Sequence, residues 1–399
     1  RLLGRRLMNV ALRGRLVGLA LVAPLLLFLA GFFVWPLVTM MQGAVSDPIA
    51  ARTLPTTARA TANWDRQSPP TPEMKAALAH DLAALKQDQV VGDLTRRLNS
   101  AQSGFRTLMS RTMSAVREQG PDVDLSAVDK RWNDIKFWQP IAEAAASRYT
   151  DRYLLAALDM DRDAAGDIVT LPESQSANKA ILARTFFVSG LVTLFCIVIG
   201  LPYAMLAVSV TGWLRGVLLA AVLLPLWTSL LVRTAAWFIL LQDNGLINRG
   251  LMALGLIDRP LALIFNRTGV VIAMTHVLLP FMVLPIFSVL LAVPRNLMPA
   301  AASLGAPPLR AFWRVLLPLS VRGIVSGSLL VFMAAIGYYI TPALIGGPTD
   351  QMISYVIAFY ATGAANWGMA GALGVILLVA TLLLYAVYQR LASDKAMGI

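Results

Sequence analysis

The sequence MPAAASLGAPPLRAFWRVLLP, residues 298–318, lies between two long apolar runs and carries only two charges, Arg310 and Arg314. Both charges are basic, and basic residues beside short loops mark the cytoplasmic side of a membrane. Glycine tolerates backbone conformations that other residues avoid, so we expect the chain to break sharply at Gly305. A chain that leaves the bilayer here, forms a short helix and re-enters at Pro318 forms a protrusion in the cytoplasm. We interpret this protrusion as a docking surface for another protein.

The rest of the chain has the composition of a membrane protein with several spans. It is 57% hydrophobic and only 14% charged. Backbone polar groups in lipid must pair internally, and the apolar runs are continuous rather than alternating, so helices are predicted rather than a β-barrel. Six runs are long enough to cross a hydrocarbon layer of about 30 Å. We therefore predict an all-α polytopic membrane bundle with six transmembrane helices, at residues 16–38, 186–208, 217–241, 270–290, 323–344 and 367–388.

The first apolar run follows a basic arm, and two interpretations of it remain open. A secretory signal peptide begins in the same way, but its apolar core is shorter and is closely followed by the small residues of a cleavage site. Here the run continues through Trp35 and Pro36. We favour a retained membrane span and keep the cleaved signal as the alternative.

The formal net charge of +12 is distributed in a way that argues against nucleic-acid binding. Residues 44–180 hold eighteen of the 22 acidic residues but only half of the 34 basic ones, so this segment is nearly neutral. The other basic residues gather in the N-terminal arm and in loops between predicted spans, where they mark the cytoplasmic face. We predict a multi-pass protein of the bacterial inner membrane, with both termini in the cytoplasm and the lipid bilayer as its surroundings.

This topology divides the chain into three parts. Residues 1–43 form a cytoplasmic arm and the first transmembrane helix, residues 44–180 a mostly helical periplasmic insertion, and residues 181–399 a five-helix core with the loop 293–320. Within the insertion, residues 48–72 are rich in Thr, Ala and Pro and predict a linker, while the remainder shows apolar residues at helical spacing. The insertion is either a structural cap or a surface that helps to receive a soluble binding protein.

This chain lacks the residues that several kinds of chemistry require. No phosphate-binding loop of the type GxxxxGK[ST] occurs, so any ATP hydrolysis belongs to a partner, and we predict neither enzymatic activity nor a cofactor here. The two histidines, His80 and His276, are too few and too far apart to predict a metal site. We expect His276 either to pack between helices as a polar group or to line a pathway.

Arg233 interrupts the predicted third span. An arginine at the centre of a bilayer costs about 2.5–3.5 kcal/mol on insertion scales. Reaching the outer interface or pairing with Asp243 would lower that cost. Charges inside membranes usually face a bundle interior or a wet cavity, so Arg233 is either a structural anchor or a pathway residue.

Polar and aromatic residues around Arg233 and at the end of the predicted fifth span complete a candidate solute pathway. Pro225 removes a backbone hydrogen bond and frees carbonyls, which suits a helix that lines a cavity. The paired tyrosines before Pro342 offer ring faces to a cation, although an interfacial aromatic belt is the alternative. The predicted pathway residues are Trp227, Thr228, Arg233, Trp237, Asp243, Tyr338, Tyr339, Thr341 and Asp350.

Residues 298–318 resemble the cytoplasmic loop motif of ABC-importer permeases, which reads Glu-Ala-Ala, three residues, Gly, and nine residues to an apolar-x-Leu-Pro ending. Pro299 stands where that family usually has its Glu. Three further stretches, residues 229–257, 276–290 and 337–354, are similar to permeases of spermidine/putrescine ABC importers. The matching residues of the loop are Ala300, Ala301, Gly305, Val315, Leu317 and Pro318.

The resemblance implies a six-span permease fold that works with a second permease subunit, two ATP-binding subunits and a periplasmic solute-binding protein. ATP and Mg would bind to the partner ATPase and not to this chain. The residues expected to couple this chain to the ATPase are Ala300, Ala301, Gly305, Ala306, Val315, Leu317 and Pro318. The implied substrate is a polyamine or a related small organic solute.

Three alternatives remain open. The first is an ABC importer for an anionic solute such as a phosphonate or an opine, because the predicted spans hold no carboxylate and Arg233 repels cations. The second is a secondary transporter or channel without an ATPase, which predicts charged coupling residues inside the spans. The third makes residues 44–180 a signalling or assembly domain on a membrane anchor.

Overall fold

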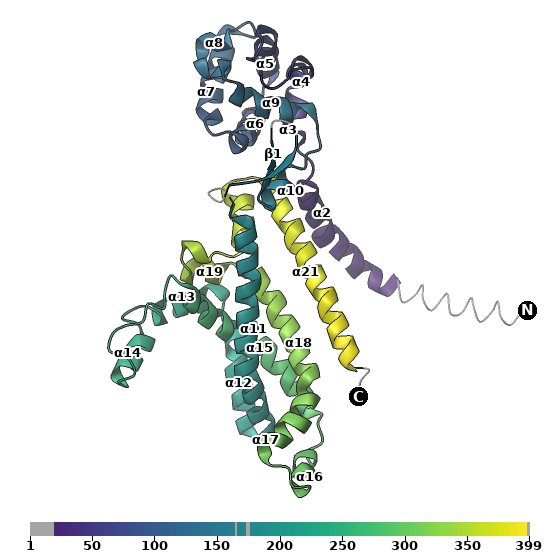
Figure 1. Cartoon of the computed structure of the whole chain (residues 1–399), viewed down its shortest axis with the longest axis vertical. Coiled ribbons are helices and arrows are strands. Elements are labelled where there is room, and N and C mark those ends of the chain that lie inside the picture. Colours follow the sequence, from purple (N-terminus) through teal and green to yellow (C-terminus); the bar gives the residue numbers. More distant parts are fainter. Residues whose placement is uncertain (1–19, 164–165, 173–175, 397–399) are drawn as a thin grey trace, which may run out of the picture. The chain divides into compact units, whose positions relative to one another are not determined.

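The computed structural model describes residues 20–163, 166–172 and 176–396, and the basic arm lies outside them (Figure 1). Its described part is mostly helical, which confirms the predicted fold class. Within these described ranges, five helices are long and apolar enough to cross a membrane, or six if one bent pair counts as a single span. The five are Ala20–Gln42, Asn178–Ser209, Arg267–Leu291, Pro308–Gly337 and Trp367–Arg390, and the bent pair is Trp213–Trp227 with Leu230–Leu240.

The chain divides into two compact units. The first comprises the residues up to Leu171 together with Tyr360–Ile376. The second comprises Pro172–Phe359 and the residues from Leu377 onward.

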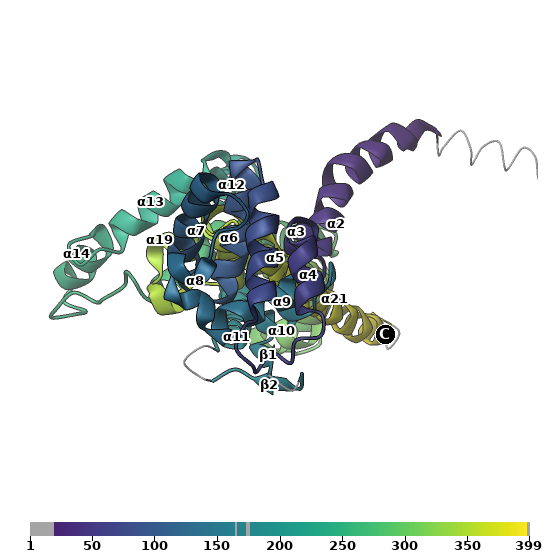
Figure 2. The same ribbon diagram turned by 90° about the horizontal axis from the view of Figure 1, so that it is seen from above.

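Small helices gathered into one cluster make up most of the first unit (Figure 2). Trp132 and Trp138 are fully buried at its centre beside Phe105 and Phe137. Both indoles find acceptors: Nε1 of Trp132 donates to Thr112 Oγ1, and Nε1 of Trp138 to the Trp132 carbonyl, each at 2.9 Å. This insertion therefore has a hydrophobic core of its own. Its elements are α3 (Pro48–Thr53), α4 (Pro55–Thr61), α5 (Pro72–Ala84), α6 (Asp88–Ala101), α7 (Phe105–Gln119), α8 (Leu125–Val128), η2 (Lys130–Asn133), α9 (Ile135–Ala146), α10 (Arg152–Ala157), β1 (Met160–Arg162) and β2 (Ile168–Thr170).

The prediction of a linker over residues 48–72 is wrong for its first half, which forms α3 and α4. Pro48 and Pro55 lie in the first helical turn, where a missing N–H costs nothing. The carboxylate of Asp81 then accepts from the N–H of Thr57 at 2.7 Å and from its hydroxyl at 2.8 Å. This cap comes from α5, so the local composition of residues 48–72 could not predict it.

The chain enters and leaves the insertion through two neighbouring segments. Ser46 and Tyr149 form an antiparallel bridge, and the N–H of Asp47 donates to the Arg148 carbonyl at 2.8 Å. Close by, buried Arg97 forms an ion pair with Asp47, which also accepts from the Tyr153 hydroxyl at 3.2 Å. Burial raises the pKa of the Tyr153 phenol to about 12, so it remains a donor.

Two glycines of α21 (Trp367–Ala396) let other parts of the first unit approach closely. A Cβ at Gly368 would lie 2.4 Å from the Tyr153 ring. A Cβ at Gly371 would lie 2.4 Å from the Met40 carbonyl oxygen in α2 (Trp35–Gln42), which follows the π-turn η1 (Ala30–Val34). Small residues at such contacts are typical of helices that pack in membranes.

Three long helices run side by side in the second unit: α11 (Asn178–Ser209), α15 (Arg267–Leu291) and α18 (Leu317–Gly337) (Figure 1). Glycines again permit the contacts. A Cβ at Gly323 would lie 2.8 Å from the Ile286 Cα, and one at Gly327 would lie 2.8 Å from Met282 Sδ. The shorter elements of this unit include α14 (Leu246–Ala253), α16 (Leu297–Ser303), η4 (Pro348–Asp350) and α20 (Ile353–Ala358), and the π-turn η5 (Phe359–Gly363) begins at the last residue of this segment and continues into the first unit.

The third predicted span is not one helix. It is two, α12 (Trp213–Trp227) and α13 (Leu230–Leu240), bent by 103°. The missing N–H of Pro225 weakens the last turn of α12, and the Thr228 hydroxyl donates to the Pro225 carbonyl at 3.0 Å. Ser229 then accepts from the Val232 N–H at 3.2 Å and caps α13. Short polar side chains satisfy both helix ends, which makes the break possible.

The fifth span is displaced from its predicted bounds of 323–344. It begins at Pro308 with α17 (Pro308–Ala311), continues through the π-turn η3 (Phe312–Leu316) and ends at Gly337. Pro318 therefore lies inside this helix and not at its start. The Leu317 N–H bonds to the Phe312 carbonyl, and this wider turn relieves the clash that a proline ring makes with the preceding turn. After Gly337, Tyr338 is extended and α19 (Ile340–Ile345) begins.

Candidate functional site

The turn at Gly305 closes α16 with two backbone hydrogen bonds. Gly305 has a φ of +79°, in the left-handed region that side chains rarely adopt. Its N–H donates to the Ala302 carbonyl at 2.9 Å, and the Ala306 N–H donates to the Ala301 carbonyl at 3.0 Å. This pair of bonds is a Schellman motif, which ends a helix abruptly. The backbone thus breaks at Gly305 as the sequence predicts.

Large apolar side chains around this turn point away from the chain. Leu304 is 89% exposed, Leu309 70% and Trp313 60%. A Cβ added at Gly305 would meet no described atom within 4 Å. We call residues 297–313 the α16–α17 surface; α16 and α17 lie together at one end of the long helices (Figure 1). Because the sequence predicts that this segment lies outside the membrane, its exposed apolar side chains make it a candidate interaction surface.

The predicted coupling residues are distributed on both sides of this turn. Ala300 and Gly305 are exposed, and Ala301 and Ala306 are half-buried beside them. Val315, Leu317 and Pro318 lie further on, in the helix that follows. The motif did not single out Leu304, Leu309 and Trp313. Their signal in the sequence is the presence of large apolar residues in a segment predicted to lie outside the membrane.

Arg233 lies on α13 with its guanidinium partly enclosed. Among the described residues no acceptor lies within hydrogen-bond distance of its buried Nε, and none of the ion pairs includes it. Asp243, a predicted partner, is exposed.

Trp237, one turn further along α13, fixes the imidazole of His276. The indole Nε1 donates to His276 Nδ1 at 3.1 Å, with the ring centroids 5.2 Å apart and the rings edge to face. An indole nitrogen only donates, so Nδ1 is the acceptor and a neutral imidazole carries its proton on Nε2. The sequence left His276 open between a packing role and a pathway role, because a lone histidine in a span gives no indication of its neighbours.

The other predicted pathway residues have different surroundings. Thr341 is buried, and its hydroxyl lies 3.1 Å from that of Thr234 on α13, which ties α19 to α13. Tyr339 is exposed, and Trp227 is exposed at the last residue of α12. Thr228 donates its hydroxyl hydrogen bond at the break between α12 and α13 described above. The structure thus joins Trp237 to His276, with Arg233 one turn earlier on α13, while Trp227 and Asp243 are exposed.

Asp350 is held in a loop of the second unit. Its carboxylate forms an ion pair with Arg267 at 3.5 Å and accepts from the Gly347 N–H at 3.3 Å. These contacts order the segment that precedes α20. Among the described residues, no carboxylate forms an ion pair with Arg233. Trp237, one turn further along α13, and His276, which it contacts, are aromatic side chains that can donate hydrogen bonds.

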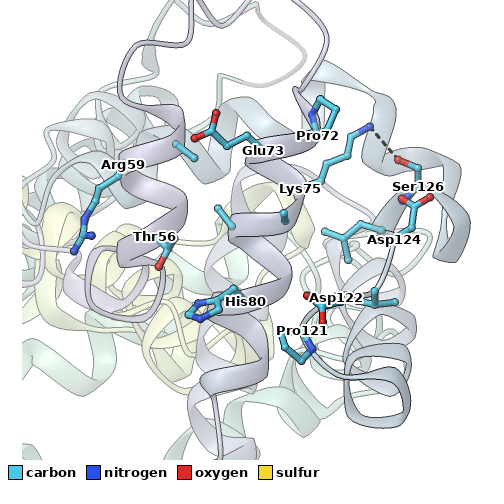
Figure 3. A pocket seen from close by; sticks show the side chains of 15 residues that line it. Thr56, Arg59, Pro72, Glu73, Lys75, His80, Pro121, Asp122, Asp124 and Ser126 are labelled. Carbon is cyan, nitrogen blue, oxygen red and sulfur yellow. Dashed lines mark hydrogen bonds between the residues drawn. The ribbon is translucent and has the colours of Figure 1, made fainter.

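The insertion carries a pocket of about 950 Å³ that the sequence does not predict (Figure 3). Lys75 lies on its wall and donates to Ser126 Oγ at 3.0 Å and to Asn133 Oδ1 at 2.5 Å. Glu73, Arg59 and His80 also line it, so its charges are mixed. In the described ranges no group of three or more His, Cys, Asp or Glu side chains could hold a metal ion.

Comparisons with known proteins identify the class. The chain is 33% identical over 210 residues to the spermidine/putrescine transport system permease protein PotB of Escherichia coli (strain K12), covering 53% of this chain and 76% of that protein. It is 33% identical over 172 residues to the molybdenum transport system permease protein ModB of Mycobacterium bovis, covering 43% and 62%. A crystal structure of a bacterial alginate ABC transporter matches with a TM-score of 0.46 and 19% identity, over 54% of this chain and 78% of that one.

The molecule is thus a multi-pass inner-membrane permease of the ABC-transporter class, and the predicted recognition is confirmed. Specifically, the chain belongs to the family of binding-protein-dependent transport system inner membrane components, which matches residues 180–396. It works with a periplasmic binding protein and with ATPase subunits, and is not itself catalytic.

Proposed function

We propose that this chain forms half of the translocation pathway of an ABC importer for polyamines, with a second permease subunit forming the other half. ATP hydrolysis on two partner subunits drives transport. The α16–α17 surface is the contact through which these subunits act on this chain. The observation that carries the proposal is the exposed apolar turn at Gly305, because a rigid, apolar end of the helical bundle suits a contact that transmits force.

Charge supports the proposed orientation. Arg295, Arg310, Arg314 and Arg322 all lie in or next to the α16–α17 surface and are exposed. Basic residues of this kind remain on the cytoplasmic side of the inner membrane. The α16–α17 surface and both termini then face the cytoplasm, and the insertion faces the periplasm.

The polyamine assignment rests on similarity. The PotB proteins of Escherichia coli and Haemophilus influenzae, named for spermidine/putrescine transport, are 33% and 34% identical to this chain over 210 residues. The family match lies at residues 180–396, where a solute pathway belongs. The test is ATP-driven uptake by the purified complex with its cognate binding protein, offered spermidine, putrescine, amino acids and phosphonates in turn. Uptake confined to amine-only solutes supports the assignment, and uptake of another class alone contradicts it.

Arg233 favours a second candidate, an importer of an anionic solute. Nε of its guanidinium is buried without a hydrogen-bond acceptor, and none of the ion pairs among the described residues includes Arg233. A polyamine carries only positive charge and would be repelled there. The same uptake panel separates the two candidates, since transport of phosphonates without polyamines selects the second.

The rival without an ATPase is tested by purification. Affinity capture of this chain from native membranes should bring down an ATP-binding subunit in stoichiometric amount. A stable, transport-active complex that lacks such a subunit would contradict the proposed function.

A further inference from the structure

A histidine is exposed near the middle of the most enclosed membrane-length helix that the structure describes, α15. His276 lies nine residues after Arg267, the first residue of this helix, so it is about 14 Å along the helix axis. Its neighbours in the chain, Thr275 and Val277, are both buried. The helix therefore presents an imidazole to the outside of this chain at a depth where a bilayer consists of hydrocarbon.

The contact with Trp237 fixes which atom of the imidazole is offered. The indole Nε1 donates to His276 Nδ1 at 3.1 Å, so the neutral ring carries its proton on Nε2. Within the described part of the chain, the hydrogen bond and the ring contact of the His276 side chain are both made with Trp237. The Nε2–H group is left without an acceptor there.

An N–H group without an acceptor is costly in hydrocarbon, because lipid tails offer no lone pair. Histidines inside membranes accordingly face a bundle interior or a water-filled cavity. The helices of this chain leave the imidazole open, so its surroundings in the assembled transporter are water or protein rather than lipid. A solute pathway between two permease subunits requires a wet face of this kind from each half.

We propose that His276 lines the solute pathway and offers its Nε2–H to water or to an acceptor oxygen of a solute. A lone pair is what this N–H binds, so the group recognises hydroxyl, carbonyl or carboxylate oxygens and not a protonated amine. The inference rests on the proposed function as a permease subunit and adds a residue to its pathway.

The experiment is thiol labelling of the complete transporter in nanodiscs. The single cysteine of this chain, Cys196, is fully buried, so the wild-type chain serves as the blank. A His276→Cys variant is treated with a membrane-impermeant methanethiosulfonate that carries a trimethylammonium group. The mass of this chain reports the labelled fraction over time. Only a thiolate reacts, and a thiol ionises in water but not in hydrocarbon.

Leu194→Cys is the matched control for a face in lipid. Leu194 is 54% exposed on α11 and is followed by the exposed Phe195. Its depth matches that of His276, because Cys196 Sγ lies 3.5 Å from the Thr275 carbonyl oxygen.

We expect the His276→Cys variant to react about tenfold faster or more than the Leu194→Cys variant. The reaction should also block ATP-driven uptake, because the attached cation then occupies the pathway. Ile272→Cys, one turn earlier on the same face of α15, is the second reporter and decides if the His276→Cys variant does not assemble.

Reaction of the reporter no faster than that of Leu194→Cys would overturn the inference. Fast labelling that leaves uptake unchanged would overturn it as well, since the wet face would then lie apart from the pathway. ATP-driven uptake of the unlabelled wild type is measured first and tests the proposed function by itself. Slow labelling in an active transporter therefore defeats this inference and leaves the proposed function intact.

Discussion

Gly305 shows how one residue can define a functional surface. Its positive φ and the two bonds of the Schellman motif turn the chain within a single residue. The same turn leaves Leu304 at the tip, with 89% of its surface exposed. The chain itself gains nothing from exposing a leucine, which is why we assign this tip to a partner.

Replacing Gly305 with Asp should uncouple ATP hydrolysis from uptake while leaving the protein in the membrane. An L-residue at positive φ costs only about 1–2 kcal/mol, too little to unfold a bundle, but the added charge lies at the proposed contact. The measurement compares ATPase rate with uptake in the reconstituted complex. Gly255→Asp is the control, since Gly255 also has positive φ (+67°) and open space around it. Wild-type coupling in the Gly305 variant would remove the α16–α17 surface from the mechanism.

Asp129 should make the insertion sensitive to acid. Its carboxylate accepts from Arg131 Nη2 at 2.7 Å and from the Arg131 N–H at 3.1 Å, and these bonds hold the pKa of Asp129 well below its usual range. A lowered pKa contributes stability above the ordinary value of about 4, and that stability is lost as pH falls further.

We therefore expect hydrogen exchange in residues 105–146 of the full-length protein to accelerate between about pH 5 and pH 3. Asp129→Asn should lose about 1–3 kcal/mol at neutral pH and flatten this dependence. Asp122→Asn, at an exposed aspartate nearby, is the control. An unchanged pH profile in Asp129→Asn would show that other carboxylates carry the effect.

At the scale of the elements, glycine contacts decide how α15 and α18 pack. The apolar runs in the sequence predict that both segments are membrane-length helices, but they do not predict how closely the two helices pack. A Cβ at Gly323 would meet the Ile286 Cα at 2.8 Å and the Pro285 carbonyl oxygen at 3.0 Å, and backbone atoms cannot rotate away.

Gly323→Ala should lower the thermal midpoint of the protein in detergent, with a loss of about 1–3 kcal/mol from overpacking. Gly190→Ala in α11 is the matched control, because a Cβ there meets nothing within 4 Å. Equal thermal midpoints for the two variants would mean that α15 and α18 can move apart without loss of stability.

Helix bounds differ from prediction where prolines combine with polar neighbours. Hydropathy alone makes residues 217–241 one span, since the window contains few polar residues. Pro225, Thr228 and Ser229 together end one helix and begin another at 103°. Pro318 has the opposite outcome, because a π-turn accommodates it within a continuous helix. A proline alone therefore does not predict a break.

At the scale of the molecule, the insertion behaves as a separable body. Its core residues all lie between Ala50 and Ala145, and Ser46 and Tyr149 are bridged at its base. The family match lies outside it, at residues 180–396. These observations favour the structural cap over a part of the transport mechanism.

Replacing residues 47–148 with a short Gly-Ser linker should leave membrane insertion, ATPase binding and uptake intact, because the two ends of the deletion are bridge partners. The measurements are complex recovery and initial uptake rate with the cognate binding protein. An assembled complex that hydrolyses ATP but no longer takes up solute would instead assign the insertion to reception of the binding protein.

The order of apolar runs, the basic loops and the glycine of residues 298–318 were enough to determine the fold class and the position of the turn at Gly305, while the family was indicated by the resemblance of the loop motif. These features follow from hydrophobic length, charge and local backbone freedom, which are properties of consecutive residues. The contact of Trp237 with His276 and the cap that Asp81 gives to α4 were decided by the tertiary structure. Each depends on groups from distant positions satisfying one another's hydrogen bonds or charge, and no local pattern encodes that pairing.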